Sequence, residues 1–173
     1  MLDFVVGMLR HADVDSGKVR VGLATYSSEP RVHFQLNKFK TRAAVEEAIG
    51  QVAYVTGSTN TADALRTLRE TMFSSRHGDR NRAPNVAMVV TDGVSNVNAD
   101  QTIEEGQLVH AAGIHVFVVG VGLTDTVEQE SIASPPGREN LFLVRTFDEL
   151  TQRDIRETTF ERMCSCELIC SRM

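Results

Sequence analysis

The chain has 173 residues, a length that fits one domain able to bury a sizeable core. Apolar residues make up 42% and charged residues 24%, a profile typical of globular domains. A net charge of −5 without any Lys/Arg-rich run argues against a nucleic-acid or anionic-membrane surface, and no apolar run reaches the ~18 residues that a membrane span needs.

The first half of the chain alternates between helical and extended patterns. The expected elements are a helix from residue 2 that stops at Gly17, strands at 19–27 and 31–36, and helices at 41–52 and 61–73. The gap between the two strands is too short for a crossover helix, so we expect them to pair antiparallel. Thr41 is placed to cap the helix that follows it.

The second half repeats a strand-then-helix order. The expected elements are strands at 85–91, 114–122 and 141–146, and helices at 100–113, near 124–134 and from Phe147. The first two of these strands are near-continuous apolar runs, as in strands covered on both faces. We therefore predict a Rossmann-like, three-layer α/β/α fold, with a mostly parallel central sheet and one antiparallel edge strand.

Polar residues follow the apolar strand at 85–91 and open the helix at 61–73. Asp92 comes directly after the strand, and the loop "GSTNT" carries Thr59 and Thr61. In open α/β sheets, ligands gather outside the carboxyl ends of the strands. Two hypotheses are compatible with this pattern. In the first, the threonines cap the helix. In the second, a threonine hydroxyl beside Asp92 is a hard oxygen ligand for a divalent cation.

Catalytic and nucleotide-binding readings find less support. "GVGLTD" carries Asp125 where a dinucleotide fingerprint needs its third glycine, and "GSTNTAD" lacks the Gly-Lys-Ser/Thr of a P-loop. A metal-dependent hydrolase using Asp92 would need a base and an oxyanion site. His110 and His115 are the nearest candidates in sequence, and both positions favour a structural role.

Several motifs together resemble a known family. "GSTNTADALR", then "NVAMVVTDGVSN", then "AAGIHVFVVGVG" occur in the order found in von Willebrand factor type A domains, of the type in matrilins and type VI collagens. "GKVRVGLATYSSEPRVHFQLNKF" and "TRAAVEEAIGQV" are similar to the second and third strands and the following helix of that family. The resemblance covers about residues 1–160 and implies the predicted fold.

The resemblance also implies a metal-ion-dependent adhesion site at the carboxyl edge of the sheet. The family site combines an Asp-x-Ser-x-Ser motif after the first strand, a Thr from a second loop and an Asp from a third. By position, Thr59 matches the Thr, with Thr61 as the alternative, and Asp92 matches the third-loop Asp. Such a site holds Mg²⁺ or Mn²⁺ and leaves one position for an acidic group on a partner.

The chain departs from the family pattern at its start. No Asp-x-Ser-x-Ser occurs in it, and "MLDFVVGMLRHADV" is similar to the helix that follows the family's first strand. That strand lies in the middle of the family sheet, so its absence would expose a strand edge on both neighbours. We therefore expect an N-terminally incomplete domain whose metal site is also incomplete.

All three cysteines, Cys164, Cys166 and Cys170, fall in the last ten residues. We predict that they form disulfides at the edge of a following module. A zinc site is the less favoured alternative, because no His lies nearby. The expected organisation is a von Willebrand factor type A domain over residues 1–160, followed at 161–173 by a linker or the start of another module.

The resemblance implies a non-catalytic, secreted adhesion module whose partners are extracellular matrix proteins such as collagens. The alternative is a purely structural domain that acts by self-association during matrix assembly, without metal-dependent binding. A metal-dependent hydrolase ranks last. The start of the chain has neither a basic region nor a small-residue cleavage site, so we expect no signal peptide within it.

Overall fold

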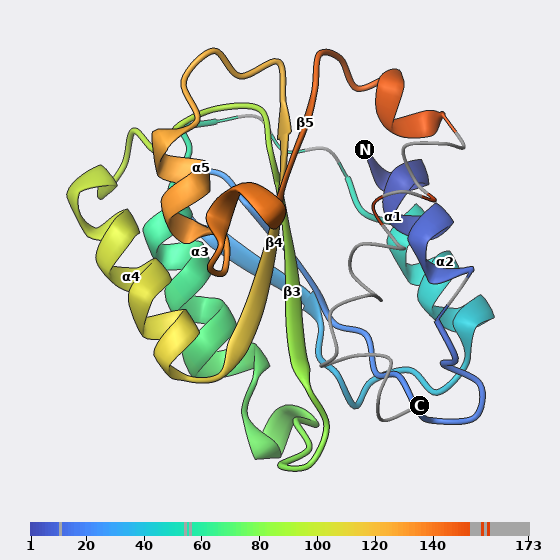
Figure 1. Ribbon diagram of the computed structural model, residues 1–173. Coiled ribbons are helices and arrows are strands. Elements are labelled where there is room, and N and C mark those ends of the chain that lie inside the picture. Colours follow the sequence, from blue (N-terminus) through green and yellow to red (C-terminus); the bar gives the residue numbers. More distant parts are fainter. Residues whose placement is uncertain (11, 54, 56, 153–156, 158, 160–173) are drawn as a thin grey trace.

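The computed structural model describes residues 1–10, 12–53, 55, 57–152, 157 and 159. Helices and strands alternate along these residues (Figure 1). The elements are α1 (Leu2–Leu9), β1 (Leu23–Tyr26), β2 (Pro30–Phe34), α2 (Arg42–Gly50), α3 (Thr61–Thr67), β3 (Asn85–Thr91), α4 (Ala99–Ala111), β4 (Ile114–Val121), α5 (Val127–Ile132) and β5 (Leu141–Val144). None of the helices described is long and apolar enough to cross a bilayer.

The strands form two sheets. β3, β4 and β5 pair in parallel in that order, with Asn85 opposite Ile114 and Val118 opposite Leu141. β1 pairs antiparallel with β2, as predicted, with Tyr26 opposite Pro30. β1 and β3 are not hydrogen-bonded to each other in the structure.

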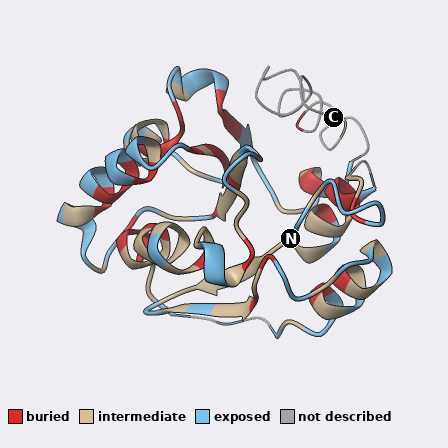
Figure 2. Ribbon diagram, turned by 90° about the horizontal axis from the view of Figure 1, so that it is seen from below, coloured by how far each residue is buried: buried red, intermediate tan, exposed pale blue. Residues whose placement is uncertain are grey.

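Helices cover both faces of the parallel sheet, which confirms the three-layer α/β/α class. Figure 1 shows α3, α4 and α5 on one side of the sheet and α1 and α2 on the other. Alternate residues of a strand point to opposite faces. Accordingly, Val116 and Val118 of β4 pack with the α3–α5 layer, whereas Phe117 packs with Phe4 of α1. In Figure 2 the buried faces of the helices line the interior of the molecule.

Local sequence signals account for several helix ends. Thr41 accepts a hydrogen bond from the Ala44 N–H at 3.3 Å and so caps α2, as predicted. Gly113 follows α4 at φ +76°, a left-handed conformation that glycine adopts without strain. The prediction that Thr59 or Thr61 caps α3 was wrong: Asn60 is the cap, and its Oδ1 accepts from the Asp63 N–H at 3.1 Å.

Some predicted bounds were too long. α1 ends at Leu9, well before Gly17, and the strand expected at 19–27 is reduced to Leu23–Tyr26, the residues that pair with β2. The helix expected over 61–73 continues after α3 as a π-helical turn, Leu68–Met72. The last predicted helix begins as a short 3₁₀ turn, Glu149–Thr151; Glu157 and Thr159 are helical, and the rest of it lies largely outside the described residues.

Candidate functional site

The loops that carry Thr59 and Asp92 meet at the carboxyl edge of β3. The Thr59 N–H donates to Asn96 Oδ1 at 2.8 Å, and the Asn96 N–H donates to the Thr59 carbonyl at 2.9 Å. Thr59 Oγ1 also lies 3.6 Å from the point where a Cβ on Gly93 would stand. The fold therefore brings together the two loops that the sequence singled out.

The two threonines of this loop differ in exposure. Thr59 is half-buried and Asp92 is exposed, so their oxygens lie at the surface of the loop edge. Thr61 is the first residue of α3 and is only 2% exposed. A ligand arriving at this edge would therefore meet the Thr59 hydroxyl and the Asp92 carboxylate rather than Thr61.

A second set of contacts holds the Asp92 loop on α5. The Glu128 carboxylate accepts from the Ser95 N–H at 3.0 and 3.1 Å and from the Ser95 hydroxyl at 3.0 Å. Gln129 Nε2 donates to the Gly93 carbonyl at 3.1 Å. Sequence reasoning missed Asn96 and Glu128, because these hydrogen bonds span 37 and 33 residues and no local pattern signals them.

Tyr26 of β1 lies beneath the loops. Its hydroxyl is buried and makes no hydrogen bond within the described part of the chain. Burial raises the pKa of Tyr26; the nearby hydroxyls of Thr91 and Thr61 lower it, and the Glu128 and Asp92 carboxylates raise it further. This neutral phenol forms the floor of the loop edge.

The residues present supply only some of the oxygen ligands that a divalent cation needs. Thr59 and Asp92 offer two hard oxygen groups, whereas Mg²⁺ requires a near-octahedral shell of about six oxygens. Among the residues that the structure describes, no group of three or more His, Cys, Asp or Glu side chains could hold a metal ion. These side chains alone therefore do not constitute a metal site, and we assign no chemical step to a metal.

The two histidines considered as bases make structural contacts. His110 Nε2 lies 3.0 Å from the Ile132 carbonyl, and His115 Nε2 lies 3.1 Å from Asn140 Oδ1. Both rings thus tie secondary-structure elements together, in keeping with the structural role that their positions favoured.

The candidate disulfide residues Cys164, Cys166 and Cys170 lie outside the described residues.

Comparison with known proteins identifies the family. The protein-family model of the von Willebrand factor type A domain matches residues 1–157 of this chain. The chain belongs to the von Willebrand factor type A family. Mouse matrilin-4 is 36% identical to this domain over 151 residues, covering 86% of this chain and 24% of matrilin-4. The collagen alpha-1(XII) chain of Notophthalmus viridescens is 30% identical over 163 residues, covering 94% of this chain and 17% of the collagen.

Solved structures agree with the fold of this von Willebrand factor type A domain. Proximal thread matrix protein 1 from the mussel byssus superimposes with a TM-score of 0.86 at 27% identity, covering 95% of this chain and 41% of that protein. Another structure of the same mussel protein, with a TM-score of 0.85 and 25% identity, has zinc in its metal-ion-dependent adhesion site (MIDAS) motif. This chain thus spans less than half of the mussel protein and at most about a quarter of the two relatives named above.

Proposed function

We propose that this von Willebrand factor type A domain is a non-catalytic protein-binding module of a secreted matrix protein, and that it engages its partner at the loop edge formed by Thr59 and Asp92. One observation carries the proposal: the reciprocal hydrogen bonds between Thr59 and Asn96 fix an exposed carboxylate and a hydroxyl on one rigid edge. The similarity to matrilins and collagens supports a matrix setting with matrix proteins, such as collagens, as partners.

A Mg²⁺ or Mn²⁺ ion that bridges to a partner carboxylate belongs to the family site. In this chain Thr59 and Asp92 supply only part of such a cation's shell, so the proposal rests on the loop edge itself. The zinc-occupied motif of the mussel protein supports a cation at the corresponding edge in that relative.

A binding assay on immobilised collagen VI tests the proposal. We expect Asp92→Ala and Thr59→Ala each to weaken binding at least about tenfold, a loss of ~1.4 kcal/mol. Glu47→Gln is the matched control, because Glu47 is an exposed acid on α2, in the opposite helix layer. If both loop variants bind like the wild type, the loop edge is not the binding surface. Loss of binding in EDTA would assign a divalent cation to the contact, and unchanged binding would assign direct protein contacts.

A structural role through self-association is the second candidate. Leu143 favours it, because this residue is 54% exposed on β5, the last strand of its sheet. An apolar side chain on a strand edge is a natural contact for another chain. Analytical ultracentrifugation of wild type and Leu143→Lys tests this role: a dimer that dissociates in the variant supports it, and a wild type that stays monomeric at high concentration counts against it.

A further inference from the structure

Basic side chains gather at the end of the domain where β3 begins. They belong to three segments of the chain: 13–20, 35–42 and 75–82. These segments, called the basic end below, hold 8 of the 18 Lys and Arg residues, including all 3 lysines, but only 3 of the 23 acidic residues. The rest of the chain is left with 10 basic and 20 acidic residues, so an acidic chain has one positive end.

Side-chain hydrogen bonds to backbone carbonyls join the first and third segments. Arg20 Nη1 donates to the Gly78 carbonyl at 2.7 Å, and Arg80 Nη1 donates to the Gly17 carbonyl at 2.9 Å. Figure 1 shows the Ser75–His77 turn at the lower end of the molecule, away from the loop that follows β3. The fold thus assembles the positive charge from distant parts of the sequence, which is why no Lys/Arg-rich run signals it.

The second segment is held against the third by Asn37. Its N–H donates to the His77 carbonyl at 3.2 Å, and its Nδ2 donates to the Arg76 carbonyl at 3.2 Å. Gly78 has φ +103°, and a Cβ placed on it would lie 2.6 Å from the Asn37 nitrogen. Only glycine permits this approach, so the spacing of the three segments is fixed by the backbone.

The acids of the basic end do not cancel its charge. Each accepts a backbone N–H of its own neighbourhood: Asp13 from Ser16 at 3.2 Å, Asp15 from Arg42 at 3.1 Å and Asp79 from Arg80 at 2.7 Å. Six of the eight cations are exposed: Lys18, Arg20, Lys38, Lys40, Arg76 and Arg82. The surface that solvent meets at this end is therefore dominated by ammonium and guanidinium groups.

A small cavity opens within the basic end. Its volume is about 310 Å³, and Arg20, Asn37 and Lys40 are among the residues that line it. This volume is at the lower limit of the ~300–1,000 Å³ typical of ligand sites. It leaves room for one substituted sugar ring between an arginine and a lysine.

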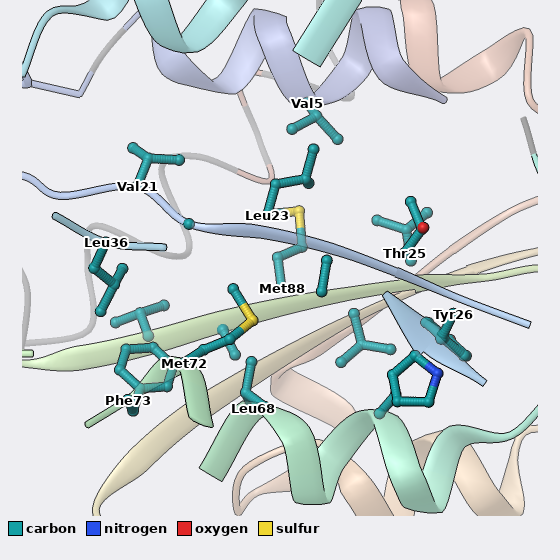
Figure 3. Close-up of a pocket in the computed structure, with 18 of the residues that line it drawn as sticks. Val5, Val21, Leu23, Thr25, Tyr26, Leu36, Leu68, Met72, Phe73 and Met88 are labelled. Atoms are coloured by element: carbon teal, nitrogen blue, oxygen red, sulfur yellow. The ribbon is translucent and has the colours of Figure 1, made fainter. Parts of the chain in front are cut away.

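The interior behind the basic end is apolar, and its surface is not. Val21 and Leu36, the sequence neighbours of Arg20 and Asn37, line an apolar cleft with Met72 (Figure 3). Among the described residues, none of the large apolar side chains that are exposed belongs to the three segments. This end therefore has nothing to insert into a membrane.

The aromatic content of the basic end also limits its ligands. Phe39 is the one Phe, Tyr or Trp of the three segments. Its ring packs edge-on against Phe34, with ring centroids 5.1 Å apart. Proteins that bind single-stranded nucleic acid combine positive charge with aromatic rings on which bases stack. The basic end offers charge and hydrogen-bond donors instead.

We propose that the basic end binds a sulfated matrix polysaccharide of the heparan sulfate class. Sulfate groups accept paired hydrogen bonds from guanidinium groups and attract lysine ammonium groups. The site lies at the opposite end of β3 from Thr59 and Asp92, so it goes beyond the proposed protein-binding function and leaves that loop edge free. Only the choice of a polysaccharide over a nucleic acid rests on the proposed matrix setting.

Surface plasmon resonance on immobilised heparin tests the proposal. We expect the wild type to bind in about 0.15 M NaCl and to bind at least about tenfold more weakly in about 0.5 M, because salt screens the charges. Lys38→Gln combined with Lys40→Gln should weaken binding at least about tenfold. The matched control is Arg138→Gln combined with Arg145→Gln, which removes two exposed cations outside the basic end and should bind like the wild type.

Four results would overturn the proposal. They are a wild type that does not bind heparin, equal losses in the two double variants, equal binding of unsulfated heparosan, and competition by duplex DNA as effective as that by heparin at equal charge. The last result would assign the basic end to nucleic acid or to polyanions in general. Asp92→Ala should keep heparin binding, so the failure of this proposal and the failure of the proposed function are told apart.

Lysine acetylation of the wild type gives a readout that needs no variant. Because Lys18, Lys38 and Lys40 are all the lysines of the chain, mass spectrometry follows the whole set at once. We expect saturating heparin to slow their acetylation at least about threefold and heparosan to leave it unchanged. Equal acetylation rates with and without heparin would overturn the proposal even if the lysine variants failed to fold.

Discussion

Thr59 and Asn96 exchange two hydrogen bonds, one from the Thr59 N–H to Asn96 Oδ1 at 2.8 Å and one from the Asn96 N–H to the Thr59 carbonyl at 2.9 Å. The pair fixes the loop before α3 against the loop after β3. The positions of the Thr59 hydroxyl and the Asp92 carboxylate are therefore set by backbone geometry and not only by side-chain rotamers.

Replacing Asn96 with Ala should loosen this edge. The change removes the acceptor for the Thr59 N–H, and we expect a loss of about 1 kcal/mol in the free energy of unfolding. Binding to the matrix partner should weaken more than stability does, because the loop geometry changes locally. Urea denaturation and the exchange rate of the Thr59 amide measure the two effects. Asn81→Ala, in an exposed loop, is the control; an Asn96 variant that behaves like it would contradict the role of the pair.

Glu105 of α4 connects α3 to α4. Its carboxylate lies 2.9 Å from Arg66 Nε and 3.0 Å from an Arg69 guanidinium nitrogen, and its side chain is only 7% exposed. Removing the buried partner of an ion pair takes away part of the compensation of the remaining charges, although Asp63 still pairs with Arg66 and Glu70 with Arg69. Because the Arg66 side chain is 37% exposed, solvent screens part of this cost.

We therefore expect Glu105→Ala to lower the free energy of unfolding by about 2 kcal/mol. Guanidinium chloride would mask an ionic contribution, so urea titration is the measurement. The neighbouring exposed acid offers a matched control, since Glu104→Ala removes the same charge from the surface of the same helix. Equal midpoints for the two variants would show that the ion pairs add no stability.

The raised pKa of Tyr26 predicts that the free energy of unfolding falls at alkaline pH. Its pKa in the folded state is raised above 10.0, chiefly by burial. The unfolded state consequently loses its proton first as the pH rises. The contribution of Tyr26 to stability is complete below pH 10.0 and is lost as the pH climbs toward the folded-state pKa.

Tyr26→Phe removes both the titrating proton and a buried hydroxyl without a partner. We expect the variant to lose less stability than the wild type above about pH 10. Urea midpoints across the alkaline range measure the difference. The sequence has 2 tyrosines, so in a Tyr54→Phe background the ultraviolet titration reports Tyr26 alone. Ionisation of that tyrosine at or below the ordinary value would contradict the predicted direction.

The partial ligand set predicts a weak response to Mg²⁺. With two oxygen side chains we expect a dissociation constant no tighter than about 10 mM, so that about 10 mM Mg²⁺ adds at most ~0.4 kcal/mol to stability. Thermal unfolding in Mg²⁺ and in EDTA should give nearly superimposable curves. A melting temperature that rises clearly with Mg²⁺ would mean that this chain holds a competent metal site after all.

Regular elements with strong local signals were predictable from the sequence. The apolar runs that became β3 and β4 were placed correctly, since a near-continuous apolar run of this length is typical of a strand covered on both faces. The cap of α3 was not predictable, because Thr59, Asn60 and Thr61 can all cap a helix. The structure selects Asn60, whose N–H is bound by the Ser27 carbonyl at 2.9 Å. That contact joins residues distant in sequence.

The candidate site was predictable only in outline. The rule that ligands gather at the carboxyl ends of parallel strands was enough to pair the Thr59 loop with Asp92. The side chains that hold the two loops, Asn96 and Glu128, depend on tertiary contacts and have no local pattern.

The separation of the strands into two sheets also affects the thermal unfolding that we expect. Val45 and Ile49 of α2 pack in one core with Phe34 of β2, whereas β4 packs in the cores on either face of the parallel sheet. α1, a helix of 8 residues, contributes Leu9 to the first core and Phe4 to the core around Phe117. Cooperativity between the hairpin side and the parallel sheet thus passes through α1 and through the contacts of α3 with β1 and β2, rather than through a shared hydrogen-bonded ladder. Calorimetry of this chain should resolve two transitions, with the hairpin and α2 unfolding at the lower temperature.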